Sequence, residues 1–203
     1  MTRRVVVFDL GGVLLDWNPR HLYRKLFDDE ASMESFLTDV CSPAWNERQD
    51  AGRPFHEAVA ELAPKHPDKL HLINAWRERF SEMIPGPLAG TVDILRDLVS
   101  RNVPVYALSN WSAETFPSQK PRFPFLDWFH GVVLSGAEGC IKPDERIFRI
   151  LLDRYGLTAR ETVFIDDNPK NAQAASGLGM HGIHFQSPGP LRRELAALGL
   201  LDS

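Results

Sequence analysis

The apolar run at residues 5–8 constrains the fold of this chain more than any other stretch. Three of its four residues are β-branched, and Asp9, Gly11 and Gly12 follow closely. A short, fully apolar run of this kind predicts a buried central strand. A carboxylate at the tip of a buried strand is costly, while glycines let the backbone approach another group closely. Asp9 is therefore the first candidate functional residue, against the alternative that it caps the next turn.

After residue 86 the sequence alternates short apolar runs with helical patterns. Apolar runs predict strands at residues 103–108, 132–134, 162–165 and 182–185. Helical spacing predicts helices near residues 92–99, 147–156, 169–177 and 191–198, whereas residues 116–129 have a looser, Phe- and Pro-rich pattern. Strands that alternate with helices are typical of βαβ units. We therefore expect an α/β fold: a Rossmann-like parallel sheet of about five strands, with helices on both faces.

Residues 18–85 have helical spacing throughout and no convincing strand. Their apolar positions predict about four helices, with the groups Leu22, Leu26 and Phe27; Met33, Phe36, Leu37 and Val40; Phe55, Ala58, Val59 and Leu62; and Leu70, Ile73, Trp76 and Phe80. Breaks are expected near residues 42–43, 50–54 and 64–67. The predicted domains are thus a discontinuous core, residues 1–17 and 86–203, and an inserted helical cap, residues 18–85.

The segment between the second and third predicted cap helices carries residues that could face a substrate. Trp45, Asn46, Arg48 and Gln49 are expected between the second and third helices of the cap. Burial of Trp45 in the cap is the alternative. Trp17 and Trp111 flank the first and second polar strand ends and are expected to wall the pocket or hold the cap hinge, with burial and no role in substrate binding favoured for each.

Composition narrows the classes of partner. The chain has 203 residues, a net charge of −4 and two cysteines far apart in sequence. This charge gives no reason to expect nucleic acid or an anionic membrane as a partner, and no stretch is apolar for long enough to span a bilayer. Two scattered cysteines fit a reducing compartment. We expect a cytoplasmic protein that acts on a small molecule, and the oligomeric state stays open.

Polar residues follow four of the predicted strands. They are Asp9, the pair Ser109 and Asn110, Ser135, and the pair Asp166 and Asp167. In a parallel sheet these strand ends lie on one edge, so three carboxylates would converge there. Their mutual repulsion favours a divalent cation, and hard oxygen ligands suit Mg²⁺. Lys142 precedes a predicted helix near the same edge, although a solvated loop lysine is the default interpretation.

Four short motifs, in order, resemble those of the haloacid dehalogenase superfamily. They are residues 9–13, Ser109-Asn110, Lys142-Pro143 and Asp166-Asp167. The helical block after the first motif resembles that superfamily's helical cap of the first type. Residues 8–13, 48–52, 108–110 and 164–168 most resemble the bacterial glucose-1-phosphate phosphatases and the phosphatase domain of soluble epoxide hydrolase.

The resemblance implies a Mg²⁺-dependent phosphatase that acts on a small phosphorylated metabolite, with sugar phosphates favoured. Asp9 would be the nucleophile and form an aspartyl-phosphate that water hydrolyses, and Lys142 would offset the negative charge. Mg²⁺ would be held by Asp9, the Gly11 carbonyl and Asp167, with Asp166 close by or acting through water. The implied substrate-binding residues are Leu10, Gly11, Ser109, Asn110 and Lys142.

Gly11 departs from the pattern of this superfamily. At this position most of its phosphatases have a second Asp, which protonates the leaving oxygen and then activates water. One interpretation is that the leaving group of the substrate needs little protonation, as in sugar 1-phosphates and acyl phosphates. A second is that another residue acts instead, and the candidates are Asp16, His21, Glu47 and His56. A phosphate-binding regulatory protein with little turnover is a further alternative. A metal-independent hydrolytic 2-haloacid dehalogenase is the enzyme alternative, but the Asp166-Asp167 pair favours the phosphatase.

Overall fold

The computed structural model describes residues 4–202 and has a five-stranded sheet in the order β3-β2-β1-β4-β5. The strands are β1 (Val5–Phe8), β2 (Val105–Ser109), β3 (Gly131–Leu134), β4 (Thr162–Asp166) and β5 (His181–His184). All neighbouring strands are parallel. The N-terminal run forms the central strand, with Val7 paired between Tyr106 and Phe164. The predicted parallel α/β sheet is confirmed.

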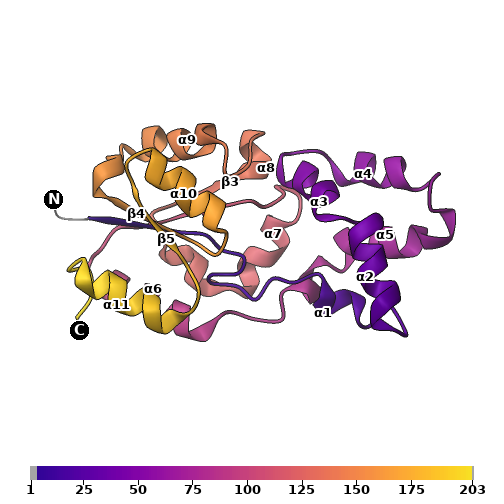
Figure 1. Cartoon of the computed structure of the whole chain (residues 1–203), viewed down its shortest axis with the longest axis horizontal. Coiled ribbons are helices and arrows are strands. Elements are labelled where there is room, and N and C mark those ends of the chain that lie inside the picture. The colour runs from indigo at the N-terminus through magenta and orange to yellow at the C-terminus, as the bar shows by residue number, and fades with distance from the viewer. Residues whose placement is uncertain (1–3, 203) are drawn as a thin grey trace.

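Helices cover both faces of this sheet (Figure 1). The helices are α6 (Ala89–Ser100) and α11 (Pro188–Ala197) on one face, and α9 (Glu145–Tyr155) and α10 (Pro169–Gly177) on the other. Successive side chains of β1 point to opposite faces of the sheet. Val6 and Phe8 pack with α6 and α11, and Val7 packs with α9 and α10. The short helices α7 (Phe116–Gln119) and α8 (Ser135–Glu138) follow β2 and β3.

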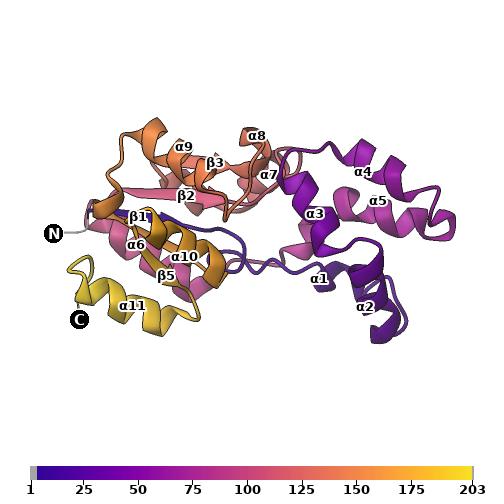
Figure 2. The ribbon, with the colours of Figure 1, turned by 45° about the horizontal axis from the view of Figure 1, so that its top comes forward.

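A separate group of helices extends from the carboxyl end of the sheet (Figures 1 and 2). These helices are α1 (Arg20–Tyr23), α2 (Glu30–Asp39), α3 (Pro43–Asp50), α4 (Phe55–Leu62) and α5 (Leu70–Glu78). Aromatic side chains fill their common core: Trp76 packs edge-on against Trp45, with ring centroids 5.4 Å apart, and Tyr23 lies against Phe36. We call residues 18–85 the cap.

The cap differs from its predicted helices in two places. Residues 43–50, expected at a break, form α3, because Ser42 accepts a hydrogen bond from the Trp45 N–H at 3.2 Å and Pro43 opens the first turn. The first predicted helix is only one turn long, since α1 ends at Tyr23, residues 24–26 form a turn and Phe27 lies beyond it. Trp45 is buried in the cap core, as its alternative interpretation held.

Two chain segments join the cap to the sheet domain and run side by side. The N–H of Asp16 donates to the Gly86 carbonyl at 3.0 Å, and the N–H of Asn18 donates to the Met83 carbonyl at 2.9 Å. The predicted domain boundaries, at residues 17–18 and 85–86, fall in this paired connection and stay a prediction. Within residues 4–202, no helix is both long and apolar enough to cross a bilayer.

Candidate active site

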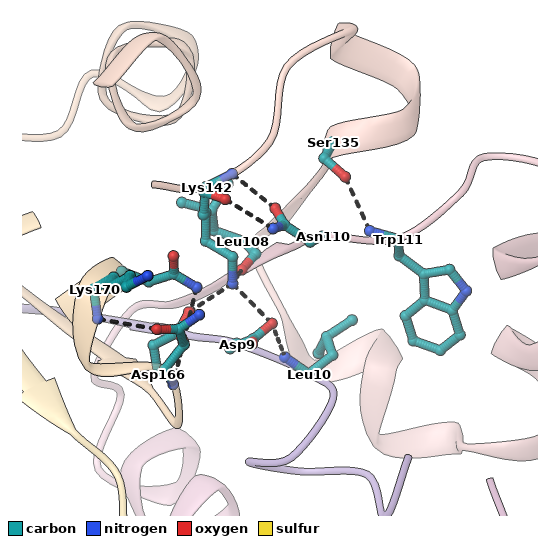
Figure 3. A network of polar contacts seen from close by, with 11 residues as sticks. Asp9, Leu10, Leu108, Asn110, Trp111, Ser135, Lys142, Asp166 and Lys170 are labelled. Atoms are coloured by element: carbon teal, nitrogen blue, oxygen red, sulfur yellow. Dashed lines mark hydrogen bonds and ion pairs between the residues drawn. The ribbon is translucent and has the colours of Figure 1, made fainter. Parts of the chain in front are cut away.

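Lys142 lies at the centre of a polar network where the strands end (Figure 3). Its ammonium nitrogen is 2.9 Å from Asp9 Oδ1 and 2.7 Å from Asp166 Oδ2, and it donates to the Leu108 carbonyl at 2.8 Å. An ammonium group has three donors, so these three oxygens satisfy it fully. Groups at the carboxyl ends of three strands, β1, β2 and β4, therefore converge on one buried charge.

Burial and the charge of the partner group shift the pKa values of Lys142 and Asp9 in opposite directions. Burial alone lowers the pKa of Lys142, but the carboxylates of Asp9 and Asp166 outweigh it and raise that pKa above its ordinary value. Burial raises the pKa of Asp9 to about 7, while Lys142 acts in the opposite direction. Lys142 thus remains charged inside the protein, and it is the group that favours the ionised form of Asp9.

Asp9 is held in a fixed orientation at the end of β1. Its Oδ1 accepts a hydrogen bond of 2.7 Å from the Leu10 N–H as well as the contact from Lys142. The Leu10 amide, predicted to bind substrate, thus positions Asp9, and Leu10 does not line the cavity described below. Because both contacts involve Oδ1, Oδ2 is the oxygen left for attack on a substrate.

Three carboxylates form an acidic cluster: Asp9, Asp166 and Asp167 each offer one oxygen within 4.8 Å of the others. Both oxygens of Asp166 already have protein partners, namely Lys142, the Asn168 N–H at 2.8 Å and Asn171 Nδ2 at 3.0 Å. Asp167 as a whole is exposed, but its carboxyl group lies against Gly12; this partial burial, followed by the Asp166 charge, raises the pKa of Asp167. The cluster therefore contains carboxylate oxygens that repel one another and suit a hard cation.

Gly12 explains how Asp167 reaches the loop after β1. Its φ is +74°, and a Cβ at this position would collide with the carboxylate of Asp167. The glycine therefore serves a close approach between the first and fourth motifs. The acidic cluster, with Asp167 brought close by Gly12, fits a Mg²⁺ ion held by Asp9 and Asp167. Asp166 would lie next to these two ligands while its own oxygens stay bonded to protein donors.

Ser109 and Asn110 lie at the end of β2, and both line the cavity. The Asn110 side chain pairs with the backbone of Lys142 through two hydrogen bonds, of 2.8 and 3.0 Å. This pairing ties the loop after β2 to the loop that carries Lys142. The Asn110 side chain is therefore structural, and its backbone and the Ser109 hydroxyl are the groups available for a phosphate.

A cavity of about 520 Å³ lies between the cap and this edge of the sheet. The core side of its wall includes Asp9, Gly11, Ser109, Lys142 and Asp167. The cap side includes Leu37, Cys41, Asn46, Glu47, Asp50, Trp76 and Phe80. Trp17 and Trp111 also line it, in agreement with the expectation that they wall the pocket; Trp111 is buried, whereas Trp17 is exposed and so differs from the expected burial. Asp166 is not among the cavity-lining residues.

Of the four residues considered as a replacement acid, only Glu47 lies in the cavity wall. Asp16 and His21 pair with each other at 3.1 Å, and His56 is exposed on α4.

Asp50, which was not among the predicted candidates, also lines the cavity. Burial raises the pKa of Asp50 to about 8. The signal that could have revealed it is the Ser-Pro helix start at residues 42–43, which extends the third helix to Asp50.

The sequence of this chain is similar to those of known proteins. Residues 3–179 match the family of haloacid dehalogenase-like hydrolases. A sesquiterpene phosphatase of Aspergillus oryzae is 28% identical over 189 residues, which cover 91% of this chain and 90% of the relative. The D-ribitol-5-phosphate phosphatase of Bacteroides thetaiotaomicron is 22% identical, over 95% of this chain and 97% of that protein.

Solved structures support the same fold. A haloacid dehalogenase family enzyme of Bacteroides thetaiotaomicron in complex with magnesium has a TM-score of 0.72 at 22% identity, over 92% of this chain and 95% of that one. L-2-haloacid dehalogenase of Xanthobacter autotrophicus has a TM-score of 0.65 at 17% identity, over 96% and 83% of the two chains. With the family match over most of the sequence, this chain belongs to the haloacid dehalogenase-like hydrolases.

Proposed function

We propose that this hydrolase is a Mg²⁺-dependent phosphatase that acts on a small phosphorylated metabolite through an aspartyl-phosphate on Asp9. The observation that carries the proposal is the position of Asp9 in the cavity wall, between the Lys142 ammonium and the carboxylate of Asp167. Phosphoryl transfer requires positioning and charge stabilisation above all, and this set of residues supplies both. The phosphatase relatives point to the same reaction class.

The roles of the residues follow from their contacts. Asp9 Oδ2 attacks phosphorus while Lys142 offsets charge on Asp9 and on the phosphoryl group. Ser109 and the Asn110 backbone, next to the Lys142 loop, hold phosphoryl oxygens. A bound Mg²⁺ would neutralise negative charge on the phosphoryl group at Asp9 and Asp167. The Gly11 carbonyl is proposed as a further ligand.

The substrate's organic group faces the cap side of the cavity. The prediction of sugar phosphates rests on Gly11, because sugar 1-phosphates need little protonation of the leaving oxygen. A second substrate class is favoured by the wall itself, where Leu37, Trp76 and Phe80 present apolar surface. A phosphate monoester of a terpenoid or aromatic alcohol would bury that surface, and the sesquiterpene phosphatase relative agrees with this class.

Nucleic acid and membranes are not proposed as partners, and the predicted cytoplasmic location remains a proposal.

Phosphate release from a panel of esters tests the proposed function. The panel contains p-nitrophenyl phosphate, sugar 1-phosphates, sugar 6-phosphates and a prenyl monophosphate, each assayed with Mg²⁺ and with EDTA. We expect release that requires Mg²⁺. Release that EDTA leaves unchanged would contradict the metal site.

Halide release from 2-chloropropionate, measured in the same samples, tests the dehalogenase alternative. We expect none, because displacement at carbon has no use for the acidic cluster. Halide release without phosphate release would replace the phosphatase by a dehalogenase. Tight binding of inorganic phosphate without release from any ester would instead favour the regulatory alternative.

A further inference from the structure

Three hydrogen bonds hold Asp50 where the cap meets the core. Its backbone carbonyl accepts a bond of 2.5 Å from Ser135 Oγ, a core residue that also receives the Trp111 N–H at 2.9 Å. Its side chain accepts from Asn46 Nδ2 at 2.8 Å and from the backbone N–H of Ser112. Because Ser112 follows Ser109 by three residues, the Asp50 carboxyl group lies beside the loop proposed to bind phosphate.

The surroundings of this carboxyl group disfavour its ionised form. Asp50 is the last residue of α3, where the backbone carbonyls carry partial negative charge. The charged groups that face it are also negative: Glu47, one turn earlier on the same helix, and Asp9 across the cavity. Burial is the main cause that raises the pKa of Asp50 to about 8; the two negative charges add to it, while the hydrogen bonds from the Ser112 N–H and from Asn46 oppose it. These surroundings therefore favour the protonated form of Asp50 at neutral pH.

Gly11 leaves the proposed reaction without its usual proton donor, and Asp50 has the position and the protonation state to supply one. Glu47 also lines the cavity, but it is exposed, and within residues 4–202 its side chain makes no hydrogen bond to the core. Asp16 and His21 are paired with each other outside the wall. Asp50 is the candidate that is both half-buried in the wall and fixed to the core.

We infer that Asp50 is the acid and base that the cap supplies to the core, an inference that rests on the proposed phosphatase function. Asp9 Oδ2 forms a bond to phosphorus, the bond from phosphorus to the leaving oxygen breaks, and that oxygen takes the Asp50 proton to leave as an alcohol. The Asp50 carboxylate then takes a proton from water as the water oxygen bonds to phosphorus. The bond to Asp9 breaks, which releases phosphate and restores both side chains.

Leaving-group dependence separates this role from a structural one. We compare Asp50→Asn with wild type on p-nitrophenyl phosphate, whose alcohol is acidic, and on propyl phosphate, whose alcohol is not. Loss of a general acid costs about 10²–10⁴-fold. We therefore expect kcat to fall by that amount on propyl phosphate and by less than about tenfold on p-nitrophenyl phosphate. Asp39→Asn, which changes an exposed carboxylate on α2, is the matched control and should change neither rate.

The pH profile gives a second readout. A general acid must be protonated, so wild-type kcat on propyl phosphate should fall as the pH rises above about 8, the pKa of Asp50. This limb should be absent from the Asp50→Asn profile. An unchanged limb in the variant would show that another group supplies the proton.

Rescue from a different position provides the sharpest test. Gly11 does not have a positive φ, and a Cβ there would meet Trp17 Cβ at 3.6 Å, an ordinary contact. Gly11→Asp added to Asp50→Asn should therefore restore turnover of propyl phosphate by at least about tenfold, because it returns a carboxyl group near the leaving oxygen. A purely structural contribution of Asp50 to cap docking would not be rescued from this position.

The outcomes are distinguishable. Equal losses on both esters in Asp50→Asn, with no rescue by Gly11→Asp, would overturn the role of Asp50 while the phosphatase stands. Absence of phosphate release from every ester by the wild-type protein would overturn the proposed function, and this inference with it.

Discussion

Lys142 carries the charge balance of the whole site. Its side chain is fully buried between Asp9 and Asp166, and each carboxylate depends on it for compensation. A buried ion pair is costly to break, since the remaining partner stays in a medium of low polarity. The same lysine thus supports the fold and the proposed chemistry.

Lys142→Met should destabilise the protein by about 3–5 kcal/mol, because it leaves two carboxylates without a cation. Urea unfolding in EDTA measures the effect. The loss should grow as the pH rises from about 5 to about 8, since the unpaired carboxylates bind protons more tightly in the folded variant than in the unfolded chain.

Lys120→Met is the matched control for this substitution, because Lys120 pairs with Asp127 at the surface. Its loss should be at most about 1 kcal/mol. Equal losses for the two variants would show that the buried network contributes no more than a surface pair.

At the scale of elements, the packing of α10 on β5 depends on Gly182, which has no side chain. A Cβ at Gly182 would collide with the carbonyl oxygen of Ala172 on α10. This contact fixes the helix that follows the Asp166–Asp167 pair, so it bears on the acidic cluster as well as on the sheet.

Gly182→Ala should lower the free energy of unfolding by about 1–3 kcal/mol through overpacking. Gly177→Ala, at the end of the same helix, has open space around its Cβ and should be neutral or stabilising by up to about 1 kcal/mol. Thermal unfolding of the two variants, monitored by circular dichroism, measures the difference. A neutral Gly182→Ala would mean that the helix can shift without cost.

The elements also show what the sequence can and cannot predict. Apolar runs and their polar ends were sufficient for the strands, because burial on both faces of a parallel sheet leaves a strong pattern. The helix α3 was missed because its sequence, residues 43–50, has one large apolar side chain and no amphipathic period. Its start signal, Ser42 before Pro43, was instead interpreted as a break.

Part of the candidate site could also be predicted. Asp9 and the acidic pair follow from strand ends, since topology alone brings strand ends together. Lys142 was expected near the same edge, but its full burial differs from the default interpretation of a solvated loop lysine. Asp50 could not, because its position depends on how the cap docks through Ser135 and Ser112. Nor could the sequence show that Asp166 is fully engaged by protein donors while Asp167 remains open.

On the scale of the whole molecule, the cavity joins two surfaces of different character. Its floor on the sheet edge is charged, and part of its cap side is apolar through Leu37, Trp76 and Phe80. We expect the floor to determine the reaction and the cap to select the organic group of the substrate, as caps that cover a reaction site do.

Straight-chain alkyl phosphates of increasing length test this division. Each methylene group buried contributes about 0.8 kcal/mol, so kcat/KM should rise roughly fourfold per carbon until the cavity is filled. Steady-state phosphate release measures the series. A flat series would contradict an apolar specificity surface and favour sugar phosphates.

The rate of Mg²⁺-dependent phosphate release by Asp9→Asn, relative to wild type, tests the central claim most directly. The amide keeps the size of the side chain but cannot act as the nucleophile, so we predict a loss of about 10⁴-fold or more on p-nitrophenyl phosphate. Circular dichroism should show that the variant is folded. A folded Asp9→Asn protein that releases phosphate at a rate near that of wild type would contradict an aspartyl-phosphate on Asp9.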